Sequence, residues 1–170
     1  MMKDLEIEKK YIIDKLEDVM EYVDLDACNK LIIEQGYLAS SPTIRVRKYN
    51  DEYCITYKSR IKSNDMSDVI VNKEVELPLT EESYRNLVKK VDYNVVTKTR
   101  YIIDIANGLK AELDVFEGKL KGLVMVEVEF ADEESAKNFI KPEWFGQDVS
   151  ALKQYKNLYL AQVENVIDVI

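Results

Sequence analysis

The 170-residue chain contains no histidine. Histidine is the commonest general base in enzymes and the partner of the nucleophile in serine–histidine and cysteine–histidine mechanisms, so its absence excludes those mechanisms. Any catalysis by this chain has to use carboxylates, amines, phenols or a metal ion. The two cysteines, Cys28 and Cys54, form no CxxC spacing and have no histidine companions, so they indicate two buried free thiols and no zinc site.

Glycine is also scarce, with five residues in the chain. None of them builds a GxGxxG or Walker-type loop, so a backbone cradle for phosphate is not expected. A phosphate bound by this protein would have to be held by side chains. The net charge of −8 argues against a nucleic-acid partner, because non-specific binding to nucleic acid depends on a cationic surface that displaces counterions.

Long apolar runs are missing as well. No stretch reaches the roughly 18 apolar residues of a membrane-spanning helix, and the N-terminal Met1, Met2, Lys3 and Asp4 lack the apolar run of a signal peptide. The sequence therefore predicts a cytoplasmic protein with no membrane partner. Its length and its 46% apolar content fit one domain over residues 1–170, as a monomer or a homodimer.

Period-2 alternation of Val, Ile and Tyr predicts eight β-strands. They cover residues 5–13, 29–38, 43–49, 53–59, 69–77, 95–105, 110–116 and 123–130. Asn50-Asp51 and Asn107-Gly108 read as tight turns between neighbouring strands, which favours antiparallel hairpins over βαβ crossovers.

Four stretches show helical spacing instead. Three of them are residues 15–23, residues 81–91 after the capping-type Thr80, and residues 133–140 after Asp132. The fourth, residues 151–163, follows Ser150 as the expected N-cap. The predicted fold is a β-rich α+β domain with peripheral helices.

Charged residues within the predicted strands recur at every second position, so each set lies on one face of its strand. Six of the eight strands carry two like-charged residues on that face. The acids are Glu6, Glu8, Glu74, Glu76, Glu112, Asp114, Glu127 and Glu129, and the bases are Lys10, Arg45, Arg47, Lys58, Lys98 and Arg100.

Two structures explain such a face. It is either the solvated side of a one-sided antiparallel sheet or the lining of an eight-stranded antiparallel β-barrel, a tunnel with a charged interior about wide enough for one small ligand. Exposed strand faces usually also contain Thr, Ser and Gln, and adjacent like charges repel unless something binds them. We therefore favour the tunnel and expect all fourteen side chains to point into one cavity.

A ligand that fits this lining needs negative charge to pair with the basic side chains and positive charge to pair with the acidic ones. A polyphosphate with Mg²⁺ or Mn²⁺ meets both needs, because these hard cations prefer carboxylate oxygens and bridge them to phosphates. Arginine grips phosphate oxygens with two donors, and lysine acts as a compact point charge. Phosphoryl transfer depends mainly on positioning and charge neutralisation, which this set supplies without histidine.

Eight short motifs occur in order along these strands. They are EIEKK at 6–10, QGYL at 35–38, IRVR at 44–47, TYK at 56–58, EVE at 74–76, KTRY at 98–101, ELDVF at 112–116 and VEVEF at 126–130. In these motifs, and in PEWFG at 142–146 and YKN at 155–157, the chain resembles the CYTH superfamily, the triphosphate tunnel metalloenzymes. The resemblance extends from Glu6 to about Ala161.

The resemblance implies an eight-stranded antiparallel tunnel and hydrolysis of a triphosphate that requires Mg²⁺ or Mn²⁺. By position, the expected metal ligands are Glu6, Glu8, Asp114, Glu127 and Glu129, and the expected phosphate ligands are Lys10, Arg45, Arg47, Lys58, Lys98 and Arg100. The residues that we expect to be catalytic are Glu6, Glu8, Lys10 and Glu129. Glu74, Glu76 and Glu112 are further tunnel carboxylates, and the first two match positions that serve a second metal, water activation or orientation of the bases.

Two positions depart from the family pattern, since many relatives carry arginine where this chain has Asn72 and Gln154. Both changes bear on substrate preference. Tyr155 and Asn157 lie on the last predicted helix, where they either close the tunnel mouth or pack as ordinary helix residues.

The short loops favour inorganic tripolyphosphate as the substrate of a metal-dependent triphosphatase. The alternatives are a class IV-type adenylate cyclase, a thiamine or nucleoside triphosphatase and a polyphosphate-binding module without catalysis.

Overall fold

The computed structural model of the chain describes residues 7–61 and 71–170. Within them, all eight expected strands are present and form one antiparallel sheet, in the order β1-β8-β7-β6-β2-β3-β4-β5. The strands are β1 Ile7–Ile12, β2 Asn29–Ser40, β3 Thr43–Tyr49, β4 Glu52–Ile61, β5 Val71–Pro78, β6 Val96–Asp104, β7 Lys110–Phe116 and β8 Val124–Phe130.

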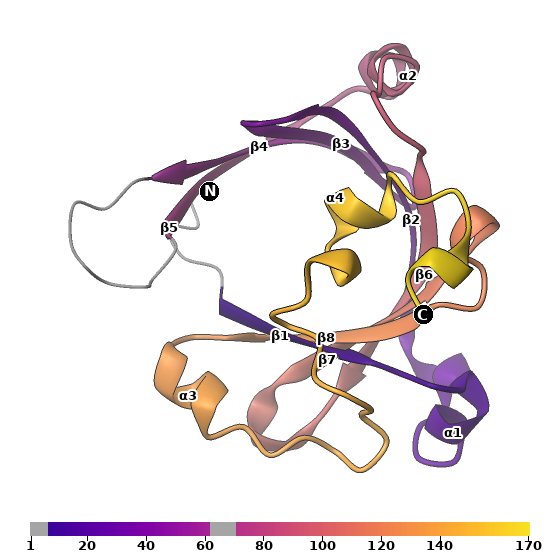
Figure 1. The fold of residues 1–170 in the computed structure, drawn as a ribbon, viewed down its shortest axis with the longest axis vertical. Coiled ribbons are helices and arrows are strands. Elements are labelled where there is room, and N and C mark those ends of the chain that lie inside the picture. The colour runs from indigo at the N-terminus through magenta and orange to yellow at the C-terminus, as the bar shows by residue number, and fades with distance from the viewer. Residues whose placement is uncertain (1–6, 62–70) are drawn as a thin grey trace.

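The sheet bends into a deep arc around the C-terminal part of the chain (Figure 1). Its two edge strands are β1 and β5, and no pairing between them is present in the described ranges. The prediction of an eight-stranded antiparallel sheet is thus confirmed, while closure of that sheet into a barrel stays a prediction.

The hairpin turns follow from residues that tolerate a left-handed backbone. Asn50, between β3 and β4, has φ of 50°, and its Oδ1 atom accepts a hydrogen bond of 2.8 Å from the backbone N–H of Ile32. Asn107 and Gly108, between β6 and β7, have φ of 63° and 71°. Asparagine and glycine carry the smallest penalty for this conformation, so both predicted turns are confirmed.

Three of the four predicted helices are present in shorter form: α1 Leu16–Met20, α2 Glu81–Val88 and α3 Glu133–Lys137. The expected caps of the last two are in place. The Thr80 hydroxyl accepts a hydrogen bond from the N–H of Ser83 (3.1 Å), and Asp132 Oδ1 accepts one from that of Ser135 (2.7 Å).

The fourth predicted helix, over residues 151–163, is wrong. The segment contains a 3₁₀ turn, η4 Lys153–Tyr155, and a short helix, α4 Asn157–Leu160, separated by Lys156 in an extended conformation with φ of −79° and ψ of 137°. Ser150 caps no helix, because its hydroxyl accepts a hydrogen bond of 2.9 Å from the backbone N–H of Lys10. Further 3₁₀ turns are η1 Leu25–Ala27, η2 Ala106–Gly108, η3 Gly118–Leu120 and η5 Val166–Asp168.

The packing of two hydrophobic cores explains why residues 151–163 do not form one peripheral helix. The first lies on the outer face of β1, β6, β7 and β8, where α1, α3 and the PEWFG segment cover residues such as Leu113 and Val126. The second lies inside the arc, where Tyr155, Leu160 and Ala161 pack against the inward-facing Tyr37 and Met125. Helix α4 is therefore not peripheral as predicted. It fills one end of the space that the sheet surrounds.

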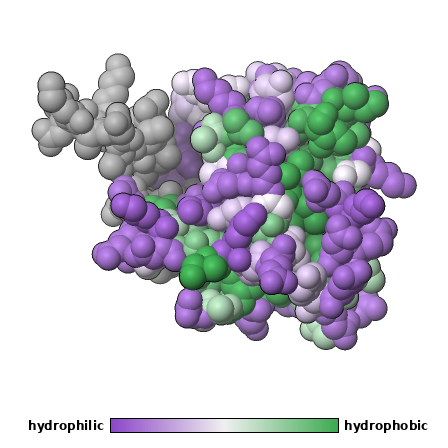
Figure 2. All heavy atoms as spheres, turned by 60° about the horizontal axis from the view of Figure 1, so that its bottom comes forward, coloured by the Kyte–Doolittle hydropathy of each residue, from purple (hydrophilic) through white to green (hydrophobic). Residues whose placement is uncertain are grey.

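On the side of α1 and α3, polar and charged side chains cover most of the surface, with apolar ones between them (Figure 2). No helix in the described part of the chain combines the length and the apolar character needed to cross a membrane.

Candidate active site

The concave face of the sheet borders a cavity of about 1300 Å³. Eleven of the fourteen predicted strand charges line it: Glu8, Lys10, Arg45, Arg47, Lys58, Glu74, Glu76, Arg100, Glu112, Glu127 and Glu129. Of the other three, Glu6 lies outside the described residues, and Lys98 and Asp114 lie buried beside the cavity with relative exposures of 2% and 0%. The alternation read from the sequence thus brings most of these charges to one place.

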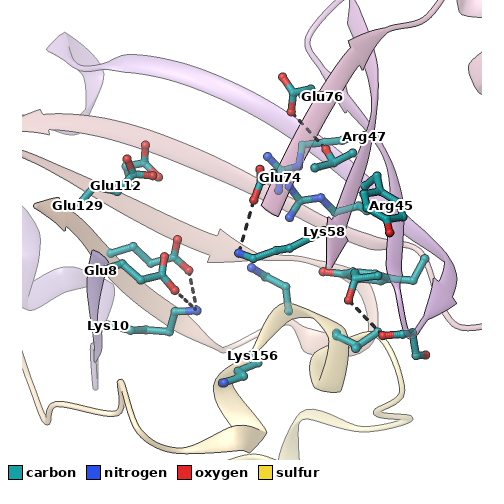
Figure 3. Close-up of a pocket in the computed structure, with 18 of the residues that line it drawn as sticks. Glu8, Lys10, Arg45, Arg47, Lys58, Glu74, Glu76, Glu112, Glu129 and Lys156 are labelled. Carbon is teal, nitrogen blue, oxygen red and sulfur yellow. Dashed lines mark hydrogen bonds and ion pairs between the residues drawn. The ribbon is translucent and has the colours of Figure 1, made fainter. Parts of the chain in front are cut away.

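The cavity has two chemically different walls (Figure 3). One is built by β1, β7 and β8, where the strand register pairs Glu8 with Glu129 and Glu112 with Glu127. The other is built by β3, β4 and β5 and carries Arg45, Arg47, Lys58, Glu74 and Glu76. The first wall is mainly acidic, whereas the second presents the two arginines.

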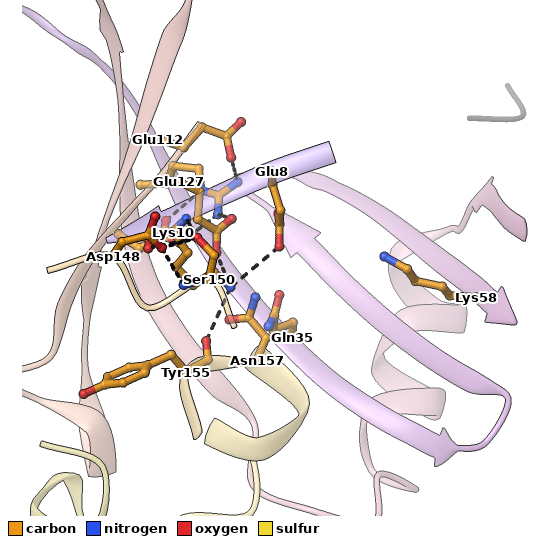
Figure 4. A network of polar contacts seen from close by, with 12 residues as sticks. Glu8, Lys10, Gln35, Lys58, Glu112, Glu127, Asp148, Ser150, Tyr155 and Asn157 are labelled. Carbon is orange, nitrogen blue, oxygen red and sulfur yellow. Dashed lines mark hydrogen bonds and ion pairs between the residues drawn. The ribbon is translucent and has the colours of Figure 1, made fainter. Parts of the chain in front are cut away.

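Lys10 stands in the acidic wall and is 6% exposed. Its Nζ atom lies 2.9 Å from Glu127 Oε1 and 3.9 Å from Glu8 Oε1, and it donates a hydrogen bond of 3.4 Å to the backbone oxygen of Tyr155 (Figure 4). Burial acts to lower the pKa of Lys10, but Glu127 and Glu8 raise it more, so the net shift is upward. Lys10 is therefore a cation at neutral pH.

Glu127 remains ionised for the complementary reason. Burial acts to raise the pKa of its carboxyl group, but Lys10, Lys98 and Arg100 together hold it well below the ordinary value. Its Oε2 atom lies 3.3 Å from Arg100 Nη2. Glu127 thus links the cavity wall to the charges buried beside it.

Those buried charges form a compact network around Asp114. One carboxylate oxygen accepts hydrogen bonds from Lys98 Nζ (2.6 Å) and Arg100 Nη2 (2.7 Å), and the other accepts one from Arg100 Nε (2.6 Å). Burial lowers the pKa of Lys98 to about 8, even though Asp114 acts to raise it.

The expectation that all fourteen charges face one cavity is wrong for Lys98 and Asp114. The C-terminal segment covers their end of the concave face, and Asn157 Oδ1 accepts a hydrogen bond of 3.5 Å from Lys98 Nζ. Cations engage both oxygens of Asp114, so in this structure it orients Lys98 and Arg100. Metal binding by Asp114 and phosphate binding by Lys98 stay predictions.

The acidic wall has the donor chemistry for a hard divalent cation. Burial raises the pKa of Glu112, and Glu127, Asp114 and Glu129 raise it further while Arg100 lowers it, so the carboxylates of this wall repel one another. Within residues 7–61 and 71–170, no three acidic or cysteine side chains converge closely enough to hold a metal ion by themselves. Mg²⁺ is usually held by one or two carboxylates and completed by water and substrate phosphates.

Sequence reasoning missed several residues of the cavity. Lys156, Ser150, Tyr37 and Tyr49 also line it. Lys156 was hidden inside an expected helix, and the two tyrosines look like ordinary strand residues. Of the two residues predicted on the last helix, Asn157 lines the cavity, whereas Tyr155 is 8% exposed and packs in the inner core.

Comparisons with known proteins agree with this geometry. No family model matches the chain. It is 34% identical over 160 residues to an inorganic triphosphatase of Nitrosomonas europaea, covering 92% of this chain and 96% of that protein. It is 30% identical over 161 residues to an inorganic triphosphatase of Acetivibrio thermocellus, covering 92% and 93%. A crystal structure of an inorganic triphosphatase superposes with a TM-score of 0.68 at 32% identity and covers 95% of this chain and 97% of its own.

Proposed function

Because the chain belongs to the CYTH superfamily of triphosphate tunnel metalloenzymes, we propose that it hydrolyses the terminal phosphoryl group of inorganic tripolyphosphate with a divalent metal ion. The observation that carries this proposal is the cavity with its two walls, arginines on β3 and carboxylates on β1, β7 and β8. A small polyanion with a cation complements both walls at once. In this proposal the curved sheet encloses the substrate as a tunnel.

The residues that line the cavity have separate roles in this proposal. Arg45 and Arg47 bind phosphate oxygens with paired donors, and Lys10 supplies a buried positive charge at the acidic wall. Glu8 or Glu129 accepts the proton of the attacking water. Glu74, whose Oε2 atom lies 3.5 Å from Lys58 Nζ, orients that lysine.

Glu76 accepts a hydrogen bond of 3.2 Å from the buried Thr56 hydroxyl. We assign Glu76 to holding the β4–β5 wall.

One or two of Glu8, Glu112 and Glu129 would hold Mg²⁺ or Mn²⁺ together with water and substrate phosphates, and Glu6, Glu127 and Asp114 are further metal ligands predicted from the sequence. When bound, such an ion neutralises phosphate charge as it builds up in the transition state. The sequence-based expectations of a single cytoplasmic domain, monomeric or homodimeric, stay predictions.

A substrate panel tests the function. Tripolyphosphate, ATP, thiamine triphosphate and pyrophosphate are each incubated with Mg²⁺ and with Mn²⁺, and orthophosphate and cyclic AMP are measured. We expect orthophosphate from tripolyphosphate with a kcat/KM at least about tenfold above that for ATP, since the charges of the two walls complement a polyphosphate and its cation without needing a base or thiazole ring. Cyclic AMP as the main product would establish the adenylate cyclase alternative, and binding without product would establish a binding module. The cyclase has less support, because two relatives with 34% and 30% identity are named inorganic triphosphatases.

Lys156 is expected to add affinity without being essential. It lies on the short connection between η4 and α4 and lines the cavity from the C-terminal segment (Figure 3). An exposed lysine contributes a modest, salt-screened attraction to phosphate, so Lys156→Ala should raise KM for tripolyphosphate about fivefold and leave kcat within about twofold. Steady-state kinetics measure both.

Lys153→Ala is the matched control, because Lys153 is an exposed lysine three residues earlier that does not line the cavity. An equal rise of KM in both variants would show that Lys156 acts only through the overall charge of this segment.

A further inference from the structure

The six predicted bases differ in what balances their charge. Four of them have a carboxylate within 4 Å: Lys10 with Glu127, Lys58 with Glu74, and Lys98 and Arg100 with Asp114. In the described part of the chain, Arg45 and Arg47 form no such ion pair. The positive charge of the β3 wall is therefore the least compensated in the cavity.

Tyrosines take the place of carboxylates beside both arginines. Arg47 Nη1 donates a hydrogen bond to the hydroxyl of Tyr49, and the guanidinium carbon lies 5.0 Å from the centre of the Tyr49 ring. Tyr37 lies directly opposite Arg45 in the β2–β3 register, is 3% exposed and lines the same cavity. Burial acts to lower the pKa of Arg45, whereas Tyr37, Tyr49 and Glu74 raise it, so the net shift is upward.

Each arginine also retains an unused donor. The Nε atoms of Arg45 and Arg47 are buried and have no hydrogen-bond partner. A buried cationic donor without an acceptor is costly, and a bound phosphate oxygen would satisfy it. This observation points to an anion on the β3 wall independently of any relative.

A phenol suits this position better than a carboxylate does. Burial raises the pKa of Tyr49, although Arg47 acts to lower it, so the hydroxyl is neutral at physiological pH. A neutral oxygen accepts a hydrogen bond and fixes the plane of the guanidinium but leaves its full charge for the substrate. A carboxylate would orient the arginine equally well and cancel that charge.

We propose that Tyr37 and Tyr49 are positioning residues that hold Arg45 and Arg47 ready for the phosphate groups of the substrate without neutralising them. This deepens the proposed function and depends on it. The two phenols reduce the side-chain entropy that the arginines would otherwise lose on binding.

The test is direct binding of tripolyphosphate by isothermal titration calorimetry, without metal, to the wild-type protein and to Tyr49→Phe, Tyr37→Phe and Arg47→Ala. Phenylalanine keeps the ring and removes the hydroxyl. We expect Tyr49→Phe to bind about three- to tenfold more weakly, as for loss of one hydrogen bond to a charged group, Tyr37→Phe to bind more weakly than the wild type, and Arg47→Ala to bind more weakly than Tyr49→Phe. In turnover assays KM should rise by the same factor, with kcat and the metal concentration for half-maximal activity changed less than about twofold.

Tyr101→Phe is the control, because Tyr101 lies on the outward face of β6 and packs against the outer core. The Nζ atom of Lys30 lies 5.1 Å from the centre of its ring. Its affinity for tripolyphosphate should equal that of the wild type. Wild-type affinity in both Tyr37→Phe and Tyr49→Phe would overturn the positioning role and leave the proposed function intact.

If the wild-type protein itself fails to bind tripolyphosphate, the proposed function fails instead. Melting curves accompany each variant. If Tyr37→Phe, which changes a buried residue, does not fold, the affinity of Tyr49→Phe, which changes a half-buried one, tests the positioning role by itself.

Discussion

Glu8→Gln is expected to lower kcat for tripolyphosphate hydrolysis about a hundredfold or more. Glu8 faces the cavity from β1, opposite Glu129, and its carboxylate lies 3.9 Å from Lys10 Nζ. The amide has nearly the same shape but no charge. It therefore weakens the hold on a divalent cation and removes one electrostatic stabiliser of the transition state, a change that typically costs two to three orders of magnitude. Steady-state kinetics with a titration of Mg²⁺ and Mn²⁺ measure the effect.

Folding should survive this change, because the Glu8 side chain is 38% exposed. The melting temperature without ligand should move by less than about 2 °C, since exposed substitutions rarely change stability by more than about 0.5 kcal/mol.

Lys9→Ala is the control: Lys9 is the next residue along β1, pairs with Val128 and points to the other side of the sheet. If Lys9→Ala lowers kcat as much as Glu8→Gln does, the assignment of strand faces that underlies the site is wrong.

Asp114→Asn should have the largest effect on stability. The substitution removes the negative charge between Lys98 and Arg100, and both Asp114 and Lys98 are nearly inaccessible to solvent. Lys98 can lose its proton, since its pKa is already about 8, whereas Arg100 cannot and keeps Glu112 and Glu127 as its remaining partners. Removing one partner of a buried ion pair typically costs on the order of 3–5 kcal/mol, which corresponds to a fall in melting temperature of roughly 10 °C for a domain of this size.

Asp104→Asn provides a matched comparison. Asp104 also pairs with a lysine, Lys110, at 2.7 Å between the same two strands, but its side chain is 86% exposed. Water screens this pair, so its loss should cost less than about 1 kcal/mol. Thermal and urea denaturation of both variants measure the difference. Equal stability of the two variants would contradict the view that the Asp114 network supports the cavity.

The strands were predictable because alternation is a local property. Arg45 and Arg47, or Glu127 and Glu129, lie two residues apart and must share a face in any strand, whatever the rest of the chain does. The turns at Asn50 and Asn107 were equally local, since few residues tolerate a positive φ. The resemblance of the motifs to a known family supplied the roles, which the alternation by itself could not assign.

The C-terminal segment was not predictable in the same way. Leu160 and Val163 are three residues apart, as on one face of a helix, yet together with Tyr155 they are buried inside the arc of the sheet on either side of an extended Lys156. The apolar spacing indicates that these side chains are buried. It does not indicate which core they join, or that Lys10, 145 residues earlier in the chain, donates a hydrogen bond to the backbone oxygen of Tyr155.

The sequence by itself determined which residues form strands and which strand face carries charge, because both depend on neighbours one or two positions away. Only the tertiary structure decided that Lys98 and Asp114 are buried beside the cavity, that Lys156 lines it, and that Tyr37 lies opposite Arg45. Those outcomes depend on where distant segments meet. The free energy of burying a charge is set by the groups that surround it in three dimensions, and no short stretch of sequence contains them.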